Sequence, residues 1–427
     1  MRSPAAVVLG GLCLVAAVPA VVYLVLFHGA ATAAATVVTC FALLVWPRPD
    51  LALVMLLGLV PVAAVAEPSG TAAVVLVTGA VAVLLFRVML KGLRPRVDLA
   101  VLLLLIFAVT VSYLLPQFTV TTERPWKSYV VLLVGLCLLA VSAAAPADPR
   151  RIAQVVAVSG AAVAGYLLLQ EEYAAGRLTG LALNPNYIGA LLALPLVAAV
   201  GLARLNRSWL WLLPALPCAT AILETRSRGA FLMVAAGVAC VVLAGRPLRH
   251  KVLIALSIFG VAMVLPGSLD EVGNSLTGDR SSAELTANTD VRKRAAWVAA
   301  RVAFDHPVRG IGYGMFPEYA RTSSDLGIYI NTHNEYLRLA AESGVGALVL
   351  FVALLWLGLA RRRTPDLAIL QALGVATAVG LLFANTLTNL VVSAPFWVSL
   401  GCLLARSARS SRPDPAPTPI LSSVRKT

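Results

Sequence analysis

Charge is scarce in this sequence. Of its 427 residues, only 13% are Asp, Glu, Lys or Arg, whereas 59% are hydrophobic. Soluble globular domains carry roughly 25% charged residues, so this composition excludes an ordinary soluble protein. The apolar residues also form long blocks that short polar segments separate. A block of about 20 helical residues crosses the hydrocarbon core of a bilayer, and the pattern therefore predicts an integral membrane protein.

Metal-binding and disulfide motifs are missing as well. The six cysteines lie singly inside apolar stretches without the spacing of metal ligands, and we interpret them as small buried hydrophobic residues. They are Cys13, Cys40, Cys137, Cys218, Cys240 and Cys402. The sequence also has no Asp-x-Asp motif and no cluster of histidines with carboxylates. We therefore expect an activity that uses no metal and no other cofactor.

The apolar blocks predict an all-α polytopic membrane protein with about 14 transmembrane helices, in the range 12–14. Loops on one side are basic, for example at Arg48, Arg87 and Arg361, and the positive-inside rule places that side in the cytoplasm. The net charge of +14 is then a feature of topology, so no nucleic acid partner is expected. The spans are placed at residues 5–27, 29–46, 51–66, 71–86, 99–115, 128–145, 152–169, 184–203, 208–223, 229–244, 252–266, 344–360, 367–388 and 389–405.

This topology divides the chain into four parts. Residues 1–266 hold transmembrane helices 1–11, residues 344–405 hold helices 12–14, and residues 406–427 form a polar, Pro-rich tail that we expect to be disordered in the cytoplasm. Residues 267–343 are the segment long enough to fold outside the membrane, as a subdomain on the extracytoplasmic face. The expected location is the cytoplasmic (inner) cell membrane, among membrane lipids, with both termini in the cytoplasm.

The 267–343 segment predicts an amphipathic helix followed by a turn. Asp290 is a plausible N-cap, and Trp297 and Phe304 share one face of the helix, which we expect to lie along the membrane surface until Asp305-His306-Pro307 ends it. The glycines of 310–314 predict a tight turn with an exposed backbone, where amides could approach an anion.

A second helix begins near His333. Thr332 and Glu335 have the spacing of a capping box, which would put His333 at the first helical position, where the helix dipole disfavours protonation. A neutral imidazole is what a general base requires. Further along, Glu342 lies one turn after Arg338 and is expected to orient either Arg338 or an arginine from the loop. Taken alone, the pattern at His333 favours a surface or capping histidine over a catalytic one.

Four groups of motifs follow one another between residues 176 and 346. They are Gly176-Arg177-Leu178-Thr179-Gly180 with Asn184-Pro185-Asn186; Thr225-Arg226-Ser227-Arg228-Gly229; Arg292 to Trp297 with His306 to Phe316; and Thr332 to Leu337 with Glu342-Ser343-Gly344. As an ordered set they resemble the O-antigen ligase and polymerase (Wzy/WaaL-like) family of polytopic membrane glycosyltransferases.

The resemblance implies a glycan donor on a polyprenyl diphosphate such as undecaprenyl diphosphate, and metal-independent transfer to a hydroxyl of a glycan, lipid or protein acceptor. The family's catalytic histidine corresponds to His333, and the arginine of its Ser-Arg motif to Arg228. The family's second arginine falls on Lys293, which Arg292 and Arg294 flank, so the sequence leaves open which of those two contacts phosphate.

The remaining site residues are assigned by position. Arg177 lies in a family-like motif at the outer membrane boundary, and a guanidinium group pairs bidentately with phosphate, so Arg177 joins Arg228 and Arg292 or Arg294 as a candidate diphosphate ligand. The expected supporting residues are Asn334, Arg338 and Glu342. Arginines near helix ends also snorkel to lipid headgroups, and this interpretation stays open for Arg124 and Arg226, whereas the family-like motifs around Arg177 and Arg228 favour ligand binding.

Two other function classes remain. A transporter or flippase of lipid-linked or amphipathic substrates would place charges near the middle of its spans, whereas the polar residues here gather at one face. A scaffold for cell-envelope machinery would need neither His333 nor the outward arginines. Within the enzyme class, the sequence does not separate polymerase from ligase, and donor sugar, acceptor, linkage and oligomeric state stay open.

Overall fold

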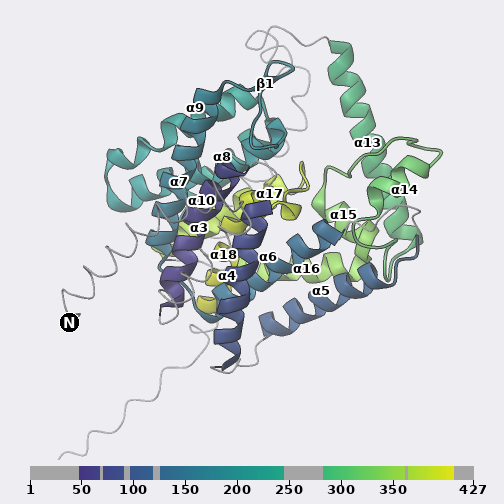
Figure 1. Ribbon diagram of the computed structural model, residues 1–427, viewed down its shortest axis with the longest axis horizontal. Helices are drawn as coiled ribbons and strands as arrows, with labels where there is room; N and C mark the ends of the chain where they lie inside the picture. The colour runs from purple at the N-terminus through teal and green to yellow at the C-terminus, as the bar shows by residue number, and fades with distance from the viewer. Residues whose placement is uncertain are drawn as a thin grey trace, which may run out of the picture.

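The computed structural model describes residues 48–67, 71–90, 97–118, 126–244, 282–360 and 364–407 (Figure 1). Within these residues nearly all regular structure is α-helical. The described strands are two short ones, β1 (Tyr173–Ala174) and β2 (Arg177–Leu178), which pair as an antiparallel hairpin. The prediction of an all-α polytopic membrane protein is confirmed.

Several of the described helices are long and apolar enough to cross a membrane. They are α3 (Pro49–Ala66), α4 (Thr71–Leu90), α6 (Trp126–Ala144), α7 (Pro149–Gln170) and α8 (Pro185–Asn206). Shorter apolar helices accompany them: α5 (Val97–Leu114), α9 (Ala215–Thr225) after the 3-10 turn η1 (Trp209–Leu212), α10 (Arg228–Val242), α16 (Val345–Leu359), α17 (Pro365–Gly380) and α18 (Leu390–Ser407).

The predicted spans correspond to these helices in position wherever the structure describes them, with one exception in length. The spans expected at 5–27, 29–46 and 252–266 lie outside the described residues, as does the expected tail from residue 408 onward. Every other predicted span overlaps one of the helices above.

One predicted span is too long. We expected a helix over 367–388, but α17 ends at Gly380, and residues 381–389, which we call the 381–389 connection, form turns and the 3-10 turn η2 (Thr386–Thr388). Non-helical backbone next to a bilayer needs partners from the protein itself. Here the Asn385 carbonyl accepts hydrogen bonds from the Tyr187 and Thr388 hydroxyl groups.

Helix α8 lies at the centre of the bundle. In its most apolar stretch 72% of the residues are buried, against 44–50% in the other four long helices. Small residues let its neighbours approach closely. A Cβ atom on Gly160 of α7 would lie 2.0 Å from the Pro195 ring of α8, and one on Gly189 of α8 would lie 2.7 Å from Ala230 of α10.

A second group of helices lies beside this bundle, at the right of Figure 1. It consists of α13 (Ser282–Asp305), α14 (Phe316–Thr322) and α15 (Glu335–Ser343). These helices share a small apolar core of their own, in which Val298 and Val302 of α13 lie in one cluster with Phe316 of α14 and Ala341 of α15. The segment between α10 and α16 is therefore a folded unit over its described residues.

The predicted start of the amphipathic helix is wrong. Asp290 lies inside α13, which begins at Ser282, because the preceding Ala, Glu and Leu residues are good helix formers. Asp290 instead pairs with Lys293 at 4.0 Å on the exposed surface. The predicted end at Asp305 and the exposed apolar face are confirmed, since the side chains of Trp297 and Phe304 are 59% and 85% exposed.

A pair of glycine substitutions tests the packing. A Cβ atom on Gly135 of α6 would lie 2.3 Å from the Trp397 indole nitrogen of α18, whereas one on Gly165 of α7 would meet no atom within 4 Å. We expect Gly135→Ala to destabilise the protein by about 1–3 kcal/mol, the usual scale of overpacking. Gly165→Ala should be neutral or slightly stabilising, because Ala favours helices over Gly by up to about 1 kcal/mol. Thermal unfolding of the purified proteins in detergent measures both, and equal midpoints would contradict the packing described here.

Candidate functional site

The Thr225–Gly229 motif is the sharp turn between α9 and α10. α9 ends at Thr225, and Arg226 adopts a left-handed conformation (φ 49°) that reverses the chain. Ser227 is the N-cap of α10, where its hydroxyl accepts a hydrogen bond from the Ala230 amide at 3.4 Å. Arg228 is therefore the first residue of α10, and its side chain is exposed. The expected phosphate ligand stands at a helix N-terminus, where the amide groups and the helix dipole also favour an anion.

Arg177 lies against the same turn. Its Nε donates to the Thr225 carbonyl at 2.7 Å, and its Nη2 donates to Asn186 Oδ1 at 3.0 Å. The Ser227 hydroxyl donates to the same Asn186 oxygen at 3.2 Å. Two of the motif groups that sequence analysis singled out therefore meet in one hydrogen-bond network. Since two of its donors bind protein oxygens, Arg177 braces the turn that carries Arg228.

His333 does not occupy the first turn of a helix, as the capping-box interpretation predicted. The residue has left-handed backbone geometry (φ 53°), and the N-cap of α15 is Asn334, whose side-chain oxygen accepts from the Leu337 amide at 3.0 Å. Thr332 is not the N-cap but stabilises the turn before the helix, because its hydroxyl donates a hydrogen bond to the Asn334 carbonyl at 2.8 Å. The chain reverses at His333, so the helix begins at Glu335, three residues after Thr332.

The imidazole of His333 is nevertheless neutral near pH 7. Burial, and secondly the positive charge of Arg292, lower the pKa of His333 from 6.5 to about 4. The helix dipole, on which the sequence argument rested, is not among these causes. The effect of Arg292 also shows that α13 brings this residue close to the His333 turn.

The three basic residues at the start of the Arg292–Trp297 motif differ in environment. Arg292 is half-buried, whereas Lys293 and Arg294 are exposed. Lys293 pairs with Asp290 on the same helix. Of the two arginines that the sequence could not separate, Arg292 is the one whose charge acts on His333.

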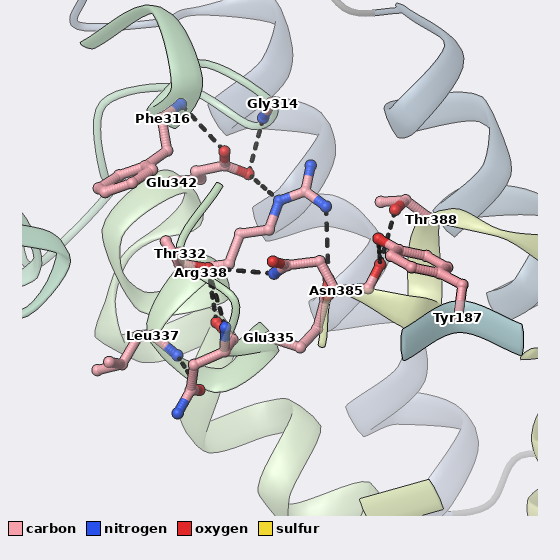
Figure 2. A network of polar contacts seen from close by, with 11 residues as sticks. Tyr187, Gly314, Phe316, Thr332, Glu335, Leu337, Arg338, Glu342, Asn385 and Thr388 are labelled. Carbon is pink, nitrogen blue, oxygen red and sulfur yellow. Dashed lines mark hydrogen bonds and ion pairs between the residues drawn. The ribbon is translucent and has the colours of Figure 1, made fainter. Parts of the chain in front are cut away.

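Glu342 organises the neighbouring loop (Figure 2). Its carboxylate accepts hydrogen bonds from the amides of Gly314 (2.8 Å) and Phe316 (3.1 Å) and from Arg338 Nε (2.9 Å). The Arg338 guanidinium group also lies 5.0 Å from the Tyr313 ring centroid. Of the two arginine partners expected for Glu342, Arg338 is therefore the one that the structure places in contact with it. Both side chains are almost fully buried, at 0% and 4% exposed.

The Gly310–Gly314 turn is buried, whereas we expected an exposed backbone. All five residues are buried, and the three glycines have positive φ angles of 62°, 122° and 83°. Two glycine contacts between residues 308–310 and the end of α15 explain the packing. A Cβ atom on Gly310 would lie 2.3 Å from the Glu342 carbonyl carbon, and one on Gly344 would lie 2.4 Å from the Val308 carbonyl oxygen. The anion that its amide approaches is the protein's own Glu342.

The His333 turn and the Arg228 turn both contact the 381–389 connection. The Asn385 side-chain amide donates to the Thr332 hydroxyl at 3.1 Å, and the Glu335 amide donates to the Leu381 carbonyl at 2.8 Å. On the other side, a Cβ atom on Gly229 would lie 3.2 Å from Phe383 Cβ. The His333 turn and the Arg228 turn therefore lie against residues that are only a few positions apart, at the same end of the bundle.

Sequence analysis did not identify three residues that contact this region. They are Asn385, Tyr187 and Glu335, whose burial was not expected. A signal was present, because Asn385-Thr386-Leu387-Thr388-Asn389 is a polar run between two apolar segments. Such a run argues against a continuous span and marks a place where backbone and polar side chains need partners.

The buried ion pair of Glu342 supports a stability prediction. Glu342→Gln leaves the Arg338 cation with Glu335, whose oxygen lies 3.7 Å away, as its remaining ion-pair partner. Breaking a buried ion pair costs about 3–5 kcal/mol, and we expect a loss of stability on that scale. In the control, Glu318→Gln, the pair with the half-exposed Arg321 is lost, and a surface pair is worth about 0–1 kcal/mol. Equal unfolding midpoints for the two variants would contradict the role given to Glu342.

Comparison with known proteins gives one family match. Residues 210–352 match the model of the Wzy_C family, described as O-antigen ligase. This confirms the resemblance over a segment that is less than half of the chain and contains Arg228, Arg292 and His333. Arg177 and the 381–389 connection lie outside it. No curated protein matches the chain.

Proposed function

We propose that this multi-pass membrane protein is a glycosyltransferase of the O-antigen ligase or polymerase type. It transfers or polymerises glycans from a polyprenyl-diphosphate donor onto an acceptor hydroxyl of a glycan, lipid or protein. The reaction takes place on the extracytoplasmic face of the cytoplasmic membrane, with both termini of the chain in the cytoplasm. The family match over 210–352 supports the ligase or polymerase class; donor, acceptor and orientation are part of the proposal.

One observation carries the proposal. The turn that holds His333 and the turn that holds Arg228 both contact the 381–389 connection, through Thr332 with Asn385 and through Gly229 with Phe383. A neutral base and a cation at a helix N-terminus are therefore near each other at one end of an apolar bundle. A lipid anchored in the bilayer presents its diphosphate at that level.

The diphosphate is held by arginine. Arg228 and Arg292 bind its oxygens and stabilise the negative charge that develops as the glycosyl–oxygen bond breaks, which is work that a metal ion does in other transferases. Arg177 contributes by bracing the Arg228 turn, and Arg294 is an outer cation on the same helix as Arg292. Asn334, Arg338 and Glu342 hold the loop and helix that present His333.

The proton balance follows from the pKa values. As the acceptor oxygen bonds to the anomeric carbon, the bond between that carbon and the diphosphate breaks, and the hydroxyl proton passes to His333. An imidazolium with a pKa of about 4 is a stronger acid than a phosphate group, whose second pKa is about 6. The proton therefore moves on to the leaving diphosphate, and His333 returns to its neutral form. General base catalysis of this kind contributes roughly 10²–10⁴-fold to a rate.

Deletion of the gene and complementation with variants test the function. We expect surface glycan to be lost and lipid-linked glycan to accumulate as single units for a polymerase, or as finished polymer for a ligase. His333→Ala should lower transfer by roughly 10²–10⁴-fold. Arg228→Gln should also lower transfer, because it removes a proposed ligand of the diphosphate.

His306→Ala and Arg321→Gln are the controls, because both residues lie in the same segment and have protein partners, Gln117 and Glu318. Full activity of His333→Ala and Arg228→Gln would remove the mechanism, and unchanged glycans in the deletion strain would favour a transporter or scaffold.

The pH dependence of transfer tests the state of His333. A base must be deprotonated to act, so activity is present above its pKa and is lost as the pH falls through it. With a pKa of about 4, the rate should stay level well below pH 6.5. Arg292→Gln removes a charge that lowers this pKa. The acidic limb of the pH–rate profile, where activity falls as His333 is protonated, should therefore move toward pH 6.5 in this variant. Arg294→Gln should leave the acidic limb in place. Loss of wild-type activity near pH 6.5 would contradict a half-buried, neutral His333.

A further inference from the structure

The 381–389 connection has one residue that touches both sides of the candidate site. Asn385 is 2% exposed, and its side-chain Nδ2 donates to the Thr332 hydroxyl at 3.1 Å. Its backbone carbonyl accepts from the Tyr187 hydroxyl at 2.9 Å and from the Thr388 hydroxyl at 2.8 Å (Figure 2). One residue thus joins the His333 turn to the first turn of α8.

We propose that Asn385 is a positioning residue, which fixes the His333 turn relative to the turn that carries Arg228. This inference rests on the proposed function, since it requires that His333 acts as the base and that Arg228 binds the diphosphate. Asn385 then sets the position of His333 relative to Arg228.

The contact toward His333 holds a conformation that the residue would not adopt alone. Few residues other than glycine adopt a positive φ, and such a conformation persists when its surroundings determine it. The Thr332 hydroxyl closes this turn by donating to the Asn334 carbonyl and accepting from the Asn334 amide. Asn385 binds that same hydroxyl from outside, so it fixes the group on which the turn depends.

The contact toward Arg228 passes through α8. Tyr187 follows Asn186, whose side-chain oxygen accepts hydrogen bonds from both Arg177 and Ser227. Further along α8, a Cβ atom on Gly189 would lie 2.9 Å from Ser227 Cβ, so the two helix N-termini have no room to slide. A shift of Asn385 would therefore move the His333 turn against a rigid α8–α10 unit.

The polar side chain of Asn385 is not explained by packing alone. Its Oδ1 is buried with no hydrogen-bond partner among the described residues, and the buried Glu335 carboxylate, which lies beside Asn385, has its ion-pair contact with Arg338 at 3.7 Å. Unsatisfied buried groups lower stability and are retained where function requires them. An apolar residue would fill this position better if filling space were its whole role.

The geometry that Asn385 sets matters because displacements of about 1 Å in a reacting group cost roughly 100-fold in rate. We expect Asn385→Ala to lower the transfer rate by roughly 10- to 100-fold. Binding of undecaprenyl diphosphate to the purified full-length protein should change by no more than about two-fold, because the phosphate ligands remain. Transfer is measured with lipid-linked glycan isolated from the deletion strain.

A thermodynamic cycle separates positioning from general loss of stability. Asn385→Ala and Thr332→Val remove the two ends of one hydrogen bond, so the double variant should be no slower than the slower single variant. In both, the acidic limb of the pH–rate profile should move upward, because a loosened turn exposes His333. Asn389→Ala is the matched control: Asn389 caps α18 by accepting from the Val391 and Val392 amides and has no contact with Thr332 in the described hydrogen bonds. It should leave rate and pH profile unchanged.

The outcomes are distinct. An unchanged rate for Asn385→Ala, effects that multiply in the double variant, or an unmoved acidic limb would overturn this inference while leaving the proposed function intact. If His333→Ala also transfers glycan at the wild-type rate, the role proposed for His333 fails, whereas unchanged glycans in the deletion strain would overturn the proposed function itself. Should Asn385→Ala not yield folded protein, Tyr187→Phe removes the opposite contact and keeps the ring; a wild-type rate in that variant would equally overturn the inference.

Discussion

The site depends on the way the Glu342 carboxylate is satisfied. Three donors from two parts of the chain meet on it: the Gly314 and Phe316 amides from the loop, and Arg338 from its own helix. A buried carboxylate is stable only with such partners, so the loop and α15 hold their places because neither can leave without exposing an unpaired charge. Glu342 therefore holds the loop and α15 together, whereas the proposed base is His333 on the neighbouring turn.

Much of the fold could be predicted because crossing a bilayer makes simple demands. Length and apolarity alone select a helix in lipid, and spans such as 128–145 and 152–169 needed no tertiary information. The same logic failed at 367–388, where hydropathy continues past Gly380 but the helix does not. The polar run at residues 385–389 is the local sign of this interruption, but the Tyr187 hydroxyl that satisfies the Asn385 carbonyl comes from a distant part of the sequence, which hydropathy does not register.

At the site, residue types were easier to predict than their surroundings. The charge of Arg338 and its pairing with Glu342 follow from four-residue spacing, which is local. The conformation of His333 is not local, since the capping pattern of Thr332 and Glu335 competed with a better cap at Asn334 and with the contact from Asn385. Arg177 was expected to face a ligand, yet the Thr225 carbonyl and Asn186 take two of its donors. For both His333 and Arg177, a partner distant in sequence decided the outcome.

The two glycine contacts between the loop and α15 have a consequence for engineering. Gly310 faces the backbone of Glu342, while Gly344 faces the backbone of Val308, so each segment fits against main chain that no side-chain substitution can remove. A clash at either glycine cannot be relieved by a second mutation across the contact. In chimaeric proteins, residues 307–345 therefore have to be exchanged as one cassette, because either half alone would meet a surface shaped for a different partner.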